Sequence, residues 1–290
     1  MKKFVSVILA AVMALSLAAC SSGSASAPAA SAASTEAAKE SALKTVTPGK
    51  LTVATSPDFA PYEFYAIDEK GEPHLAGFDM ALAQYIADDL GLELEVIPMD
   101  FDGTIAELTN KNVDMSLAGY SVTEDRKEVM DFSIVYYGGG QSFVTVKGKE
   151  DKLKDLEAAN NAEFQIGAQT GSIQAGLAEK FTPNAEIVQM AKVTDIIADM
   201  LQGKMDGAFI ETAVAESYQK NYPDLVIVCD VPYESEGSAA GISKGNTELV
   251  EAINAAIEKC ISSGKFDEFV ETAKKQAEGE IIEGLLEEKK

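Results

Sequence analysis

The chain has 290 residues, of which 46% are hydrophobic and 24% are charged, a globular composition with room for two domains. Its formal net charge of −23 argues against a nucleic-acid-binding surface and against electrostatic adhesion to anionic lipid. The acidity instead favours solubility and mutual repulsion.

Residues 1–20 are predicted to be a signal peptide. Lys2 and Lys3 precede an apolar run that is too short to span a bilayer comfortably. The run closes with Leu17-Ala18-Ala19-Cys20, which resembles the lipobox of bacterial lipoproteins. That resemblance implies cleavage before Cys20 and lipidation of its sulfur, with two acyl chains as a stable anchor. An ordinary secretory signal that happens to contain a cysteine is the alternative.

Residues 21–46 are rich in Ser, Ala, Gly and Pro and are expected to form a flexible linker, because they cannot bury enough surface to offset their ordering entropy. Strands and helices then alternate. Apolar periodicity and turn residues predict a strand, a helix stopped by Gly91, a strand, a short helix with Asp102 as N-cap, and a strand. Their ranges are 51–54, 79–90, 92–97, 102–108 and 113–117.

The rhythm breaks at Gly138-Gly139-Gly140 and resumes in a second series of strands and helices, which precedes two amphipathic helices. The strands are expected at 141–146, 164–168, 186–189, 206–210 and 225–229, and the helices at 172–180, 194–202, 247–262 and 266–276. The pattern predicts an α/β fold with two lobes, each a mostly parallel sheet flanked by helices. Lobe 1 would comprise 47–138 plus 237–290 and lobe 2 would comprise 139–236. Glycine-rich crossings near 137–142 and 231–238 would form a hinge, unless they are plain turns.

Cys229 and Cys260 are the remaining cysteines of an exported chain, where a disulfide is one possibility. Cys260 continues the apolar stripe of a helix, and Cys229 ends a strand, so two buried free thiols are the favoured interpretation. The single histidine, His74, stands alone in a Gly/Pro-rich loop, so no metal site and no cofactor are predicted.

Arg126 is the first candidate binding residue. It follows a small apolar strand that ends at Ala118-Gly119, with Ser121 between them. A guanidinium grips a planar carboxylate with two parallel hydrogen bonds, which indicates capture of a small acid or amino acid. A surface salt bridge to Glu124 is the structural alternative.

Several segments together resemble the solute-binding proteins of bacterial polar amino-acid ABC importers, family 3, over residues 51–276. The segments are Ser-Pro-Asp-Phe-Ala-Pro-Tyr-Glu-Phe (56–64), Ala-Gly-Phe-Asp-Met-Ala-Leu-Ala (76–83), Ala-Gly-Tyr-Ser-Val-Thr-Glu-Asp-Arg (118–126), Asp-Phe-Ser (131–133), Gly-Ala-Gln-Thr-Gly-Ser (167–172) and Asp-Gly-Ala-Phe (206–209). The resemblance implies a periplasmic-binding-protein-like fold of type II, whose two lobes close on an amino acid.

The resemblance also implies the ligand contacts. Arg126 matches the residue on the ligand carboxylate, Ser121 matches a hydroxyl position, and Ala118-Gly119 lies beside them. Glu211 stands where the family usually has the aspartate that pairs with the ligand ammonium, and a solvated helix start is its alternative. Phe59 and Phe101 match the apolar walls, although either could belong to the core.

Thr170, Gly171 and Ser172 form a strand-to-helix junction, where free backbone N–H groups favour an anion. A common helix cap is the alternative there. Ser56 replaces an aspartate frequent in relatives that prefer basic ligands, so a neutral or polar ligand is expected.

The predicted function is therefore capture of an amino acid outside the cell by a monomer that is held at the membrane only through its lipid anchor. The ligand would pass to an ABC permease, and no nucleic acid would bind. One alternative is a dehydratase-like enzyme with Glu211 as general acid. A sensor or receptor module is another, for which no transmembrane or kinase segment follows Gln276 in this sequence.

Overall fold

A computed structural model describes residues 43–67, 70–234 and 236–278. All of them belong to one compact unit, Glu40–Lys290. The predicted signal peptide, the lipobox at Cys20 and most of the predicted linker lie outside the described residues, as does the segment 279–290. None of the helices in the described ranges combines the length and the apolar character that a membrane span requires.

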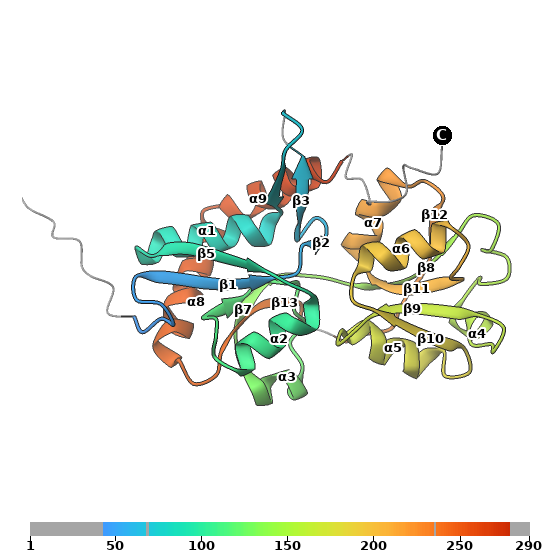
Figure 1. The fold of residues 1–290 in the computed structure, drawn as a ribbon, viewed down its shortest axis with the longest axis horizontal. Helices are drawn as coiled ribbons and strands as arrows, with labels where there is room; N and C mark the ends of the chain where they lie inside the picture. Colours follow the sequence, from blue (N-terminus) through green and yellow to red (C-terminus); the bar gives the residue numbers. More distant parts are fainter. Residues whose placement is uncertain (1–42, 68–69, 235, 279–290) are drawn as a thin grey trace, which may run out of the picture. The chain divides into compact units, whose positions relative to one another are not determined.

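The first of two five-stranded sheets in the described residues has the order β5-β1-β6-β13-β7. We call it, with its helices and a small three-stranded sheet, lobe 1 (Figure 1). The strands are β1 (Lys50–Thr55), β5 (Glu93–Pro98), β6 (Met115–Ser116), β7 (Met130–Tyr137) and β13 (Ser238–Ser243), with β2 (Asp58–Phe59), β3 (Glu63–Ile67) and β4 (Pro73–Ala76) in the small sheet. The helices are α1 (Phe78–Leu90), α2 (Phe101–Thr109), α3 (Glu124–Val129), α8 (Thr247–Ser262) and α9 (Lys265–Gln276).

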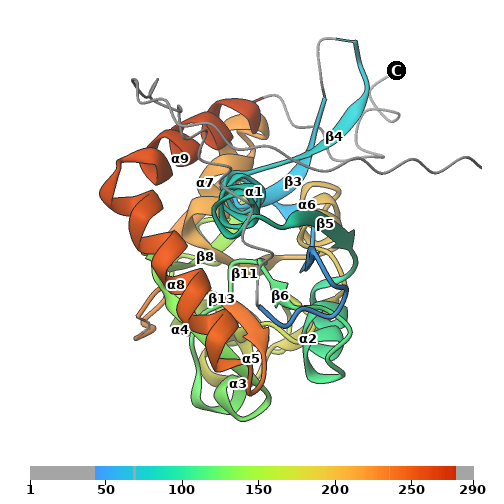
Figure 2. The same ribbon diagram turned by 90° about the vertical axis from the view of Figure 1, so that its left-hand side faces the viewer.

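Alternation along β1 gives this sheet two buried faces. Leu51 and Val53 belong to the cluster that includes Leu82 of α1 and Ile253 of α8, whereas Ala54 belongs to the cluster around Leu108 of α2. Helices α1, α8 and α9 pack together on one side and α2 packs on the other (Figure 2). Both faces are covered, as is usual where parallel strands are joined by helices.

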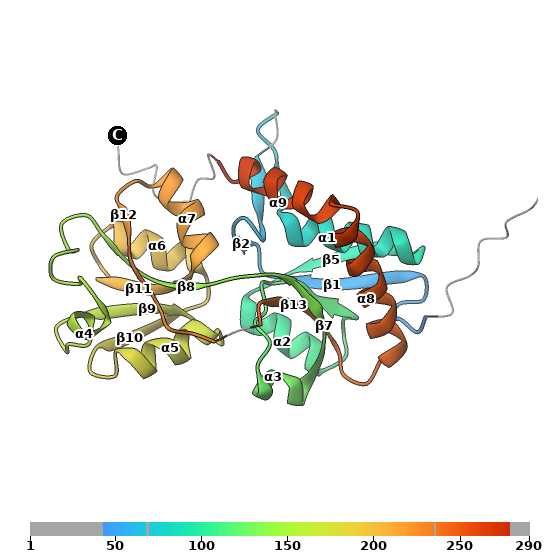
Figure 3. The same cartoon turned by 180° about the vertical axis from the view of Figure 1, so that it is seen from behind.

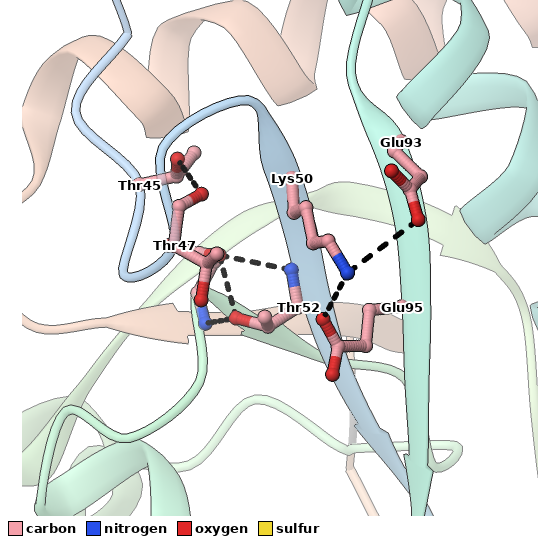
Figure 4. Close-up of polar contacts among 7 residues, drawn as sticks. Thr45, Thr47, Lys50, Thr52, Glu93 and Glu95 are labelled. Carbon is pink, nitrogen blue, oxygen red and sulfur yellow. Dashed lines mark hydrogen bonds and ion pairs between the residues drawn. The ribbon is translucent and has the colours of Figure 1, made fainter. Parts of the chain in front are cut away.

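Polar contacts fix the start of β1 against its neighbours (Figure 4). Lys50 Nζ lies 3.4 Å from Glu93 and 3.1 Å from Glu95 of β5. The hydroxyl and the backbone N–H of Thr52 both donate to Asp114, at 2.6 and 2.9 Å. These contacts hold the start of β1 against β5 and Asp114.

The second sheet, with its helices, forms lobe 2 and has the order β10-β9-β11-β8-β12. Its strands are β8 (Gln141–Val146), β9 (Gln165–Gln169), β10 (Glu186–Met190), β11 (Gly207–Glu211) and β12 (Leu225–Asp230). Along β11, Phe209 packs with the cluster that contains Leu177, whereas Ala208 and Ile210 pack with the cluster that contains Ile196. The helices are α4 (Leu156–Ala159), α5 (Ile173–Phe181), α6 (Val193–Leu201) and α7 (Thr212–Asn221).

The chain passes between the two sheets twice, from β7 to β8 and from β12 to β13. The two passages run side by side in Figure 3, and Ser238 pairs with Tyr137 where they meet lobe 1. Gly237 has φ 120°, and a Cβ there would lie 2.5 Å from the carbonyl oxygen of Tyr137. Glycine is therefore required where the second passage meets the first.

The two-lobed α/β architecture predicted from the sequence is confirmed, but the strand pairing is more mixed than predicted. In each five-stranded sheet two pairings are parallel and two are antiparallel. The antiparallel pairings involve β8, β12, β13 and β7, which lead into or out of the passages. A strand that returns directly from the other lobe needs no helical crossover, so it can run antiparallel to its neighbour.

Smaller predictions were wrong. The N-cap of α2 is Asp100, not Asp102, whose carboxylate accepts from the N–H of Gly103. His74 lies in β4 rather than in a loop. Both cysteines are free, as favoured, but Cys229 is half-exposed and only Cys260 is buried.

Candidate functional site

A cavity of about 20 Å³ lies between the carboxyl ends of strands from both lobes and is lined by residues of each. That volume holds about one water molecule, so any larger ligand requires the surrounding side chains or the lobes to move. Six of the predicted site residues line it, namely Phe101, Gly119, Ser121, Arg126, Ser172 and Glu211.

Arg126 enters the cavity from α3. The hydroxyl of Thr123 accepts the backbone N–H of Arg126 and so caps this short helix. The guanidinium donates from Nη1 to the carbonyl oxygen of Ser121 at 3.1 Å and from Nη2 to that of Gly171 at 3.4 Å. It lies 5.4 Å from the centroid of the Phe101 ring and 5.3 Å from that of Tyr120, within cation–π range.

Burial lowers the pKa of Arg126, but an arginine keeps its charge at physiological pH. The alternative salt bridge to Glu124 does not form, because Glu124 pairs with Lys127 at 2.8 Å. The buried cation therefore has carbonyl oxygens and aromatic rings around it, and no carboxylate is paired with it among the described contacts.

Gly119 holds the loop after β6 close to the aromatic residues. Its φ is 58°, and a Cβ there would lie 2.9 Å from the ring of Phe59. Its N–H donates to Asp79 Oδ2 at 3.2 Å. The neighbouring residue Ala118 is buried in the cluster of Phe101 and does not line the cavity.

The two predicted aromatic walls separate in the structure. Phe101, the first residue of α2, lines the cavity. Phe59 lies beside Gly119 and packs against Tyr62 with the rings tilted and their centroids 5.3 Å apart. It belongs to the main core cluster and does not line the cavity. Phe59 therefore supports the loop from behind.

The junction at Thr170–Ser172 differs from the prediction of free backbone donors. The N–H of Thr170 donates to the carbonyl oxygen of Met190, and that of Ser172 donates to Gln169. Ser172 is the N-cap of α5, with its hydroxyl accepting from Ala175. The unpaired N–H groups of a helix belong to its first turn, which here begins with Ile173 and Gln174, both lining the cavity.

Glu211 faces the cavity from lobe 2 and is also the N-cap of α7. Its Oε2 accepts from the N–H of Val214 at 2.9 Å and its Oε1 from that of Gly140 at 3.4 Å. Burial raises the pKa of Glu211 to about 7, and these backbone donors offset part of the shift. The side chain is 4% exposed, so the alternative of a solvated helix start is excluded.

Other lining residues were missed from the sequence. Three are glutamines of lobe 2, and Gln174 Nε2 donates to Gln141 Oε1 at 2.8 Å. The remaining ones lie at the two passages or at the start of α5. The position of Gln169 at the carboxyl end of a strand was a signal in the sequence. An amide there needs a polar partner if it is buried, because amides are seldom buried without one. The missed residues are Gly139, Gln141, Gln169, Ile173, Gln174, Gly237 and Ser238.

A buried acidic layer lies behind the loop of Gly119. Asp79 Oδ2 accepts from Tyr136 Oη at 3.0 Å as well as from Gly119. Burial raises the pKa of Asp79 to about 6, and burial beside Asp79 also raises the pKa of Glu63. Asp79 thus ties α1 to the cavity loop and to β7. The described residues contain no group of His, Cys, Asp and Glu side chains that could hold a metal ion.

Comparison with known proteins identifies the type of protein in which this geometry occurs. The family described as bacterial extracellular solute-binding proteins, family 3, matches residues 51–274. The chain belongs to this family. A similar relative is the arginine-binding extracellular protein ArtP of Bacillus subtilis (strain 168), 33% identical over 223 residues that span 75% of this chain and 83% of ArtP.

Two solved structures extend the comparison. The amino acid ABC transporter substrate-binding protein AbpA of Streptococcus pneumoniae, bound to L-arginine, has a TM-score of 0.75 and 33% identity over 79% of this chain and 96% of AbpA. The ancestral amino acid-binding protein AncCDT-1, a precursor of cyclohexadienyl dehydratase, has a TM-score of 0.70 and 29% identity over 77% of this chain and 95% of its own. This family-3 protein is thus a solute-binding protein.

Proposed function

We propose that the cavity binds a free α-amino acid, with Arg126 on its carboxylate and Glu211 on its ammonium group. One observation carries the proposal: a buried guanidinium from lobe 1 and a buried carboxylate from lobe 2 line the same cavity. A zwitterion complements both charges at once. The contacts with both lobes exist only when the lobes are closed, so the ligand stabilises closure.

The first turn of α5 supplies a second site for the ligand carboxylate. Ile173 and Gln174 begin the helix and line the cavity, and the helix dipole favours an anion there. Charge-assisted hydrogen bonds contribute roughly 1.5–3 kcal/mol each. After the ordering costs, a few such bonds give about −8 to −11 kcal/mol, an affinity between micromolar and tens of nanomolar.

The three glutamines favour a polar, uncharged ligand side chain. Amide groups both donate and accept hydrogen bonds, so Gln141, Gln169 and Gln174 suit a side chain that does the same. Glu211 is the only acidic side chain among the described lining residues. In this proposal it pairs with the ligand ammonium, so no carboxylate remains for a cationic ligand side chain. Arginine, for which ArtP is named and which AbpA holds, is the competing ligand.

The remaining parts of the proposal concern where the protein works. Residues 1–20 carry the lipoprotein signal, cleavage before Cys20 removes the residues that precede it, and Cys20 anchors the chain to the outer face of the cell membrane. Residues 21–46 act as the tether of a monomer whose lobes are 47–138 plus 237–290 and 139–236. The closed form delivers the amino acid to the permease of the transporter.

Isothermal titration calorimetry with the twenty amino acids, cystine and a few opines tests the ligand. At least one neutral polar amino acid is expected to bind. Arg126→Ala should weaken that binding at least about a hundredfold, because two charge-assisted bonds are lost. Arg126→Lys should also weaken it, because lysine cannot form the paired bonds.

The matched control is Lys127→Ala on the same helix, which removes an exposed cation paired with Glu124. It should leave the affinity within about twofold. Failure of every amino acid to bind the wild-type protein would contradict the proposal. Unchanged affinity in both Arg126 variants would assign that residue a structural role.

A dehydratase-like enzyme is the second candidate, because the pKa of about 7 suits Glu211 to general acid catalysis and AncCDT-1 precedes a dehydratase. Incubation with cyclohexadienyl carboxylic acids, followed by NMR, tests it. Turnover that Glu211→Gln abolishes would establish the enzyme, and absence of turnover in the wild-type protein would leave binding as the function.

A further inference from the structure

Asp58 connects the two lobes outside the cavity lining. It lies on β2 in lobe 1, and its Oδ1 accepts from Ser56 Oγ at 2.8 Å. Its Oδ2 accepts from Gln169 Nε2 at 3.1 Å and from the backbone N–H of Val193 at 2.5 Å, both in lobe 2. The hydroxyl of Tyr218 on α7 also donates to the carbonyl oxygen of Asp58 at 3.3 Å. One residue of lobe 1 thus receives three hydrogen bonds from lobe 2.

The contact with Val193 completes the N-terminus of α6. The N-cap of this helix is Lys192, whose side chain makes no capping hydrogen bond. In lobe 2, α5 and α7 are capped by their own N-cap side chains, Ser172 and Glu211. For α6 the capping carboxylate is that of Asp58 from lobe 1. At the start of α6 the helix dipole and the charge of Lys192 both favour an anion.

Asp58 is separated from the bound ligand by its own partner. Gln169 lines the cavity and donates to Asp58, whereas Asp58 does not line the cavity. The side chain is 5% exposed, and burial raises the pKa of Asp58 to about 6. The charged groups around it are Lys192 on α6 and Glu63 on β3. At pH 8 the carboxylate of Asp58 is ionised and accepts the hydrogen bonds from Ser56, Gln169 and Val193.

We propose that Asp58 is a latch between the lobes, a contact that the protein makes with itself and that stabilises closure around any ligand. The proposal rests on ligand binding in the inter-lobe cavity. The cavity admits no amino acid unless side chains or the lobes move, and opening of the lobes is the route of ligand exchange in this proposal. Opening separates Asp58 from Val193 and Gln169, and the latch therefore slows release without contacting the ligand. Asp58 is a positioning residue for the closed state.

Two substitutions at pH 8 test the latch. Asp58→Ala should raise the Kd of every amino acid that binds by roughly ten- to a hundredfold, because bonds to a charged acceptor are lost. Asp58→Asn keeps the size and one acceptor oxygen and should raise it by a smaller factor. The increase should lie in the dissociation rate measured by stopped flow. Small-angle scattering of the unliganded protein should show a larger radius of gyration for Asp58→Ala.

The control is Asp155→Ala, which removes a carboxylate that caps α4 within lobe 2 by accepting from the N–H of Ala158 at 2.8 Å. It should leave Kd, dissociation rate and scattering unchanged. L-arginine and L-glutamine are the probes. Loss of arginine binding alone would make Asp58 a contact of a cationic side chain and overturn the latch. Unchanged Kd and scattering in both Asp58 variants would also overturn it. If no amino acid binds the wild-type protein, the proposed function fails, and the scattering comparison still decides the latch.

Discussion

Glu211 combines a structural and a chemical role in one side chain. It caps α7 and presents its carboxylate to the cavity, where burial raises its pKa to about 7. The side chain reaches the N–H groups of Val214 and Gly140 together. A capping residue is held by its helix, so the charge is positioned before any ligand arrives.

The raised pKa of Glu211 predicts how stability changes with pH. The folded protein holds a proton on Glu211 up to about pH 7, whereas the unfolded chain loses it near pH 4.5. The folded state therefore binds more protons between these values, and its stability falls as pH rises. In Glu211→Gln this contribution is absent. The free energy of unfolding of the wild-type protein, relative to the variant, should fall by about 2–3 kcal/mol from pH 5 to pH 8.

Urea unfolding of both proteins at several pH values measures this difference. Asp58 and Asp79, whose pKa values are also raised, are present in both proteins and cancel in the comparison. Parallel pH profiles for the two proteins would show that Glu211 titrates normally in the folded state.

At the scale of single residues, Arg126 was a candidate from its position after an apolar strand, whereas Glu211 was a candidate only through the resemblance to the family. Both line the cavity. Gln141 and Ser238 could not be predicted, because they reach the cavity through pairing with Glu211 and Ser121, residues distant in the sequence. Phe59 was predicted to wall the cavity, with the core as its alternative, and it lies in the main core cluster. An aromatic residue near a cavity and one inside the core look alike in sequence.

Helix α8 shows what periodicity determines at the level of one element. Its predicted range of 247–262 agrees with the structure. Its apolar stripe is the face that packs against the rest of lobe 1, including α1 and β7. Ile253 is fully buried on that face, whereas Ile261 is 42% exposed. The same residue type therefore occupies opposite environments on one helix.

This contrast predicts unequal effects of the same substitution. Ile253→Ala should lower the free energy of unfolding by about 2–5 kcal/mol, because it removes buried methyl groups and leaves a cavity. Ile261→Ala should change it by less than about 0.5 kcal/mol. Urea denaturation of both variants provides the measurement. Similar losses would mean that α8 packs differently from the arrangement described.

Elements with weaker periodicity were harder to predict. Strand β13, Ser-Ala-Ala-Gly-Ile-Ser, resembles a loop in composition, yet all its residues are buried. A Cβ at Gly241 would lie 2.9 Å from Leu108 of α2, so small residues let that helix approach the sheet. The need for small residues comes from the partner helix, and sequence alone does not show which partner that is.

At the scale of the whole molecule, the two passages between the lobes run close to the cavity. Gly139 lines it, and the N–H of Gly140 donates to Glu211. A Cβ at Gly140 would lie 2.8 Å from Thr212 Oγ1, whereas one at Gly138 would meet nothing within 4 Å. Adjacent glycines of the same passage therefore differ in their tolerance of a side chain.

Gly140→Ala should displace the start of β8 from α7 and weaken binding of the best amino acid about tenfold, since overpacking costs about 1–3 kcal/mol. Gly138→Ala should leave the affinity within about twofold. Calorimetric titration of both variants checks the pair. Equal affinities would show that the passage adjusts without affecting Glu211. The run of three glycines predicted a passage between the lobes. Only the tertiary contacts show which of these glycines tolerates a side chain.

Strand order in lobe 1 has a consequence for how the molecule assembles as it is synthesised. Strand β13 lies between β6 and β7, so β7 lacks its neighbour until residues 238–243 have been made. All five strands of the lobe 2 sheet, in contrast, come from the continuous stretch 141–230. Since domains generally fold as units while the chain emerges, the later half of the sequence is the first to complete a sheet. The sheet of lobe 1, begun by the first strand of the described chain, is completed only after residues 238–243 have been synthesised.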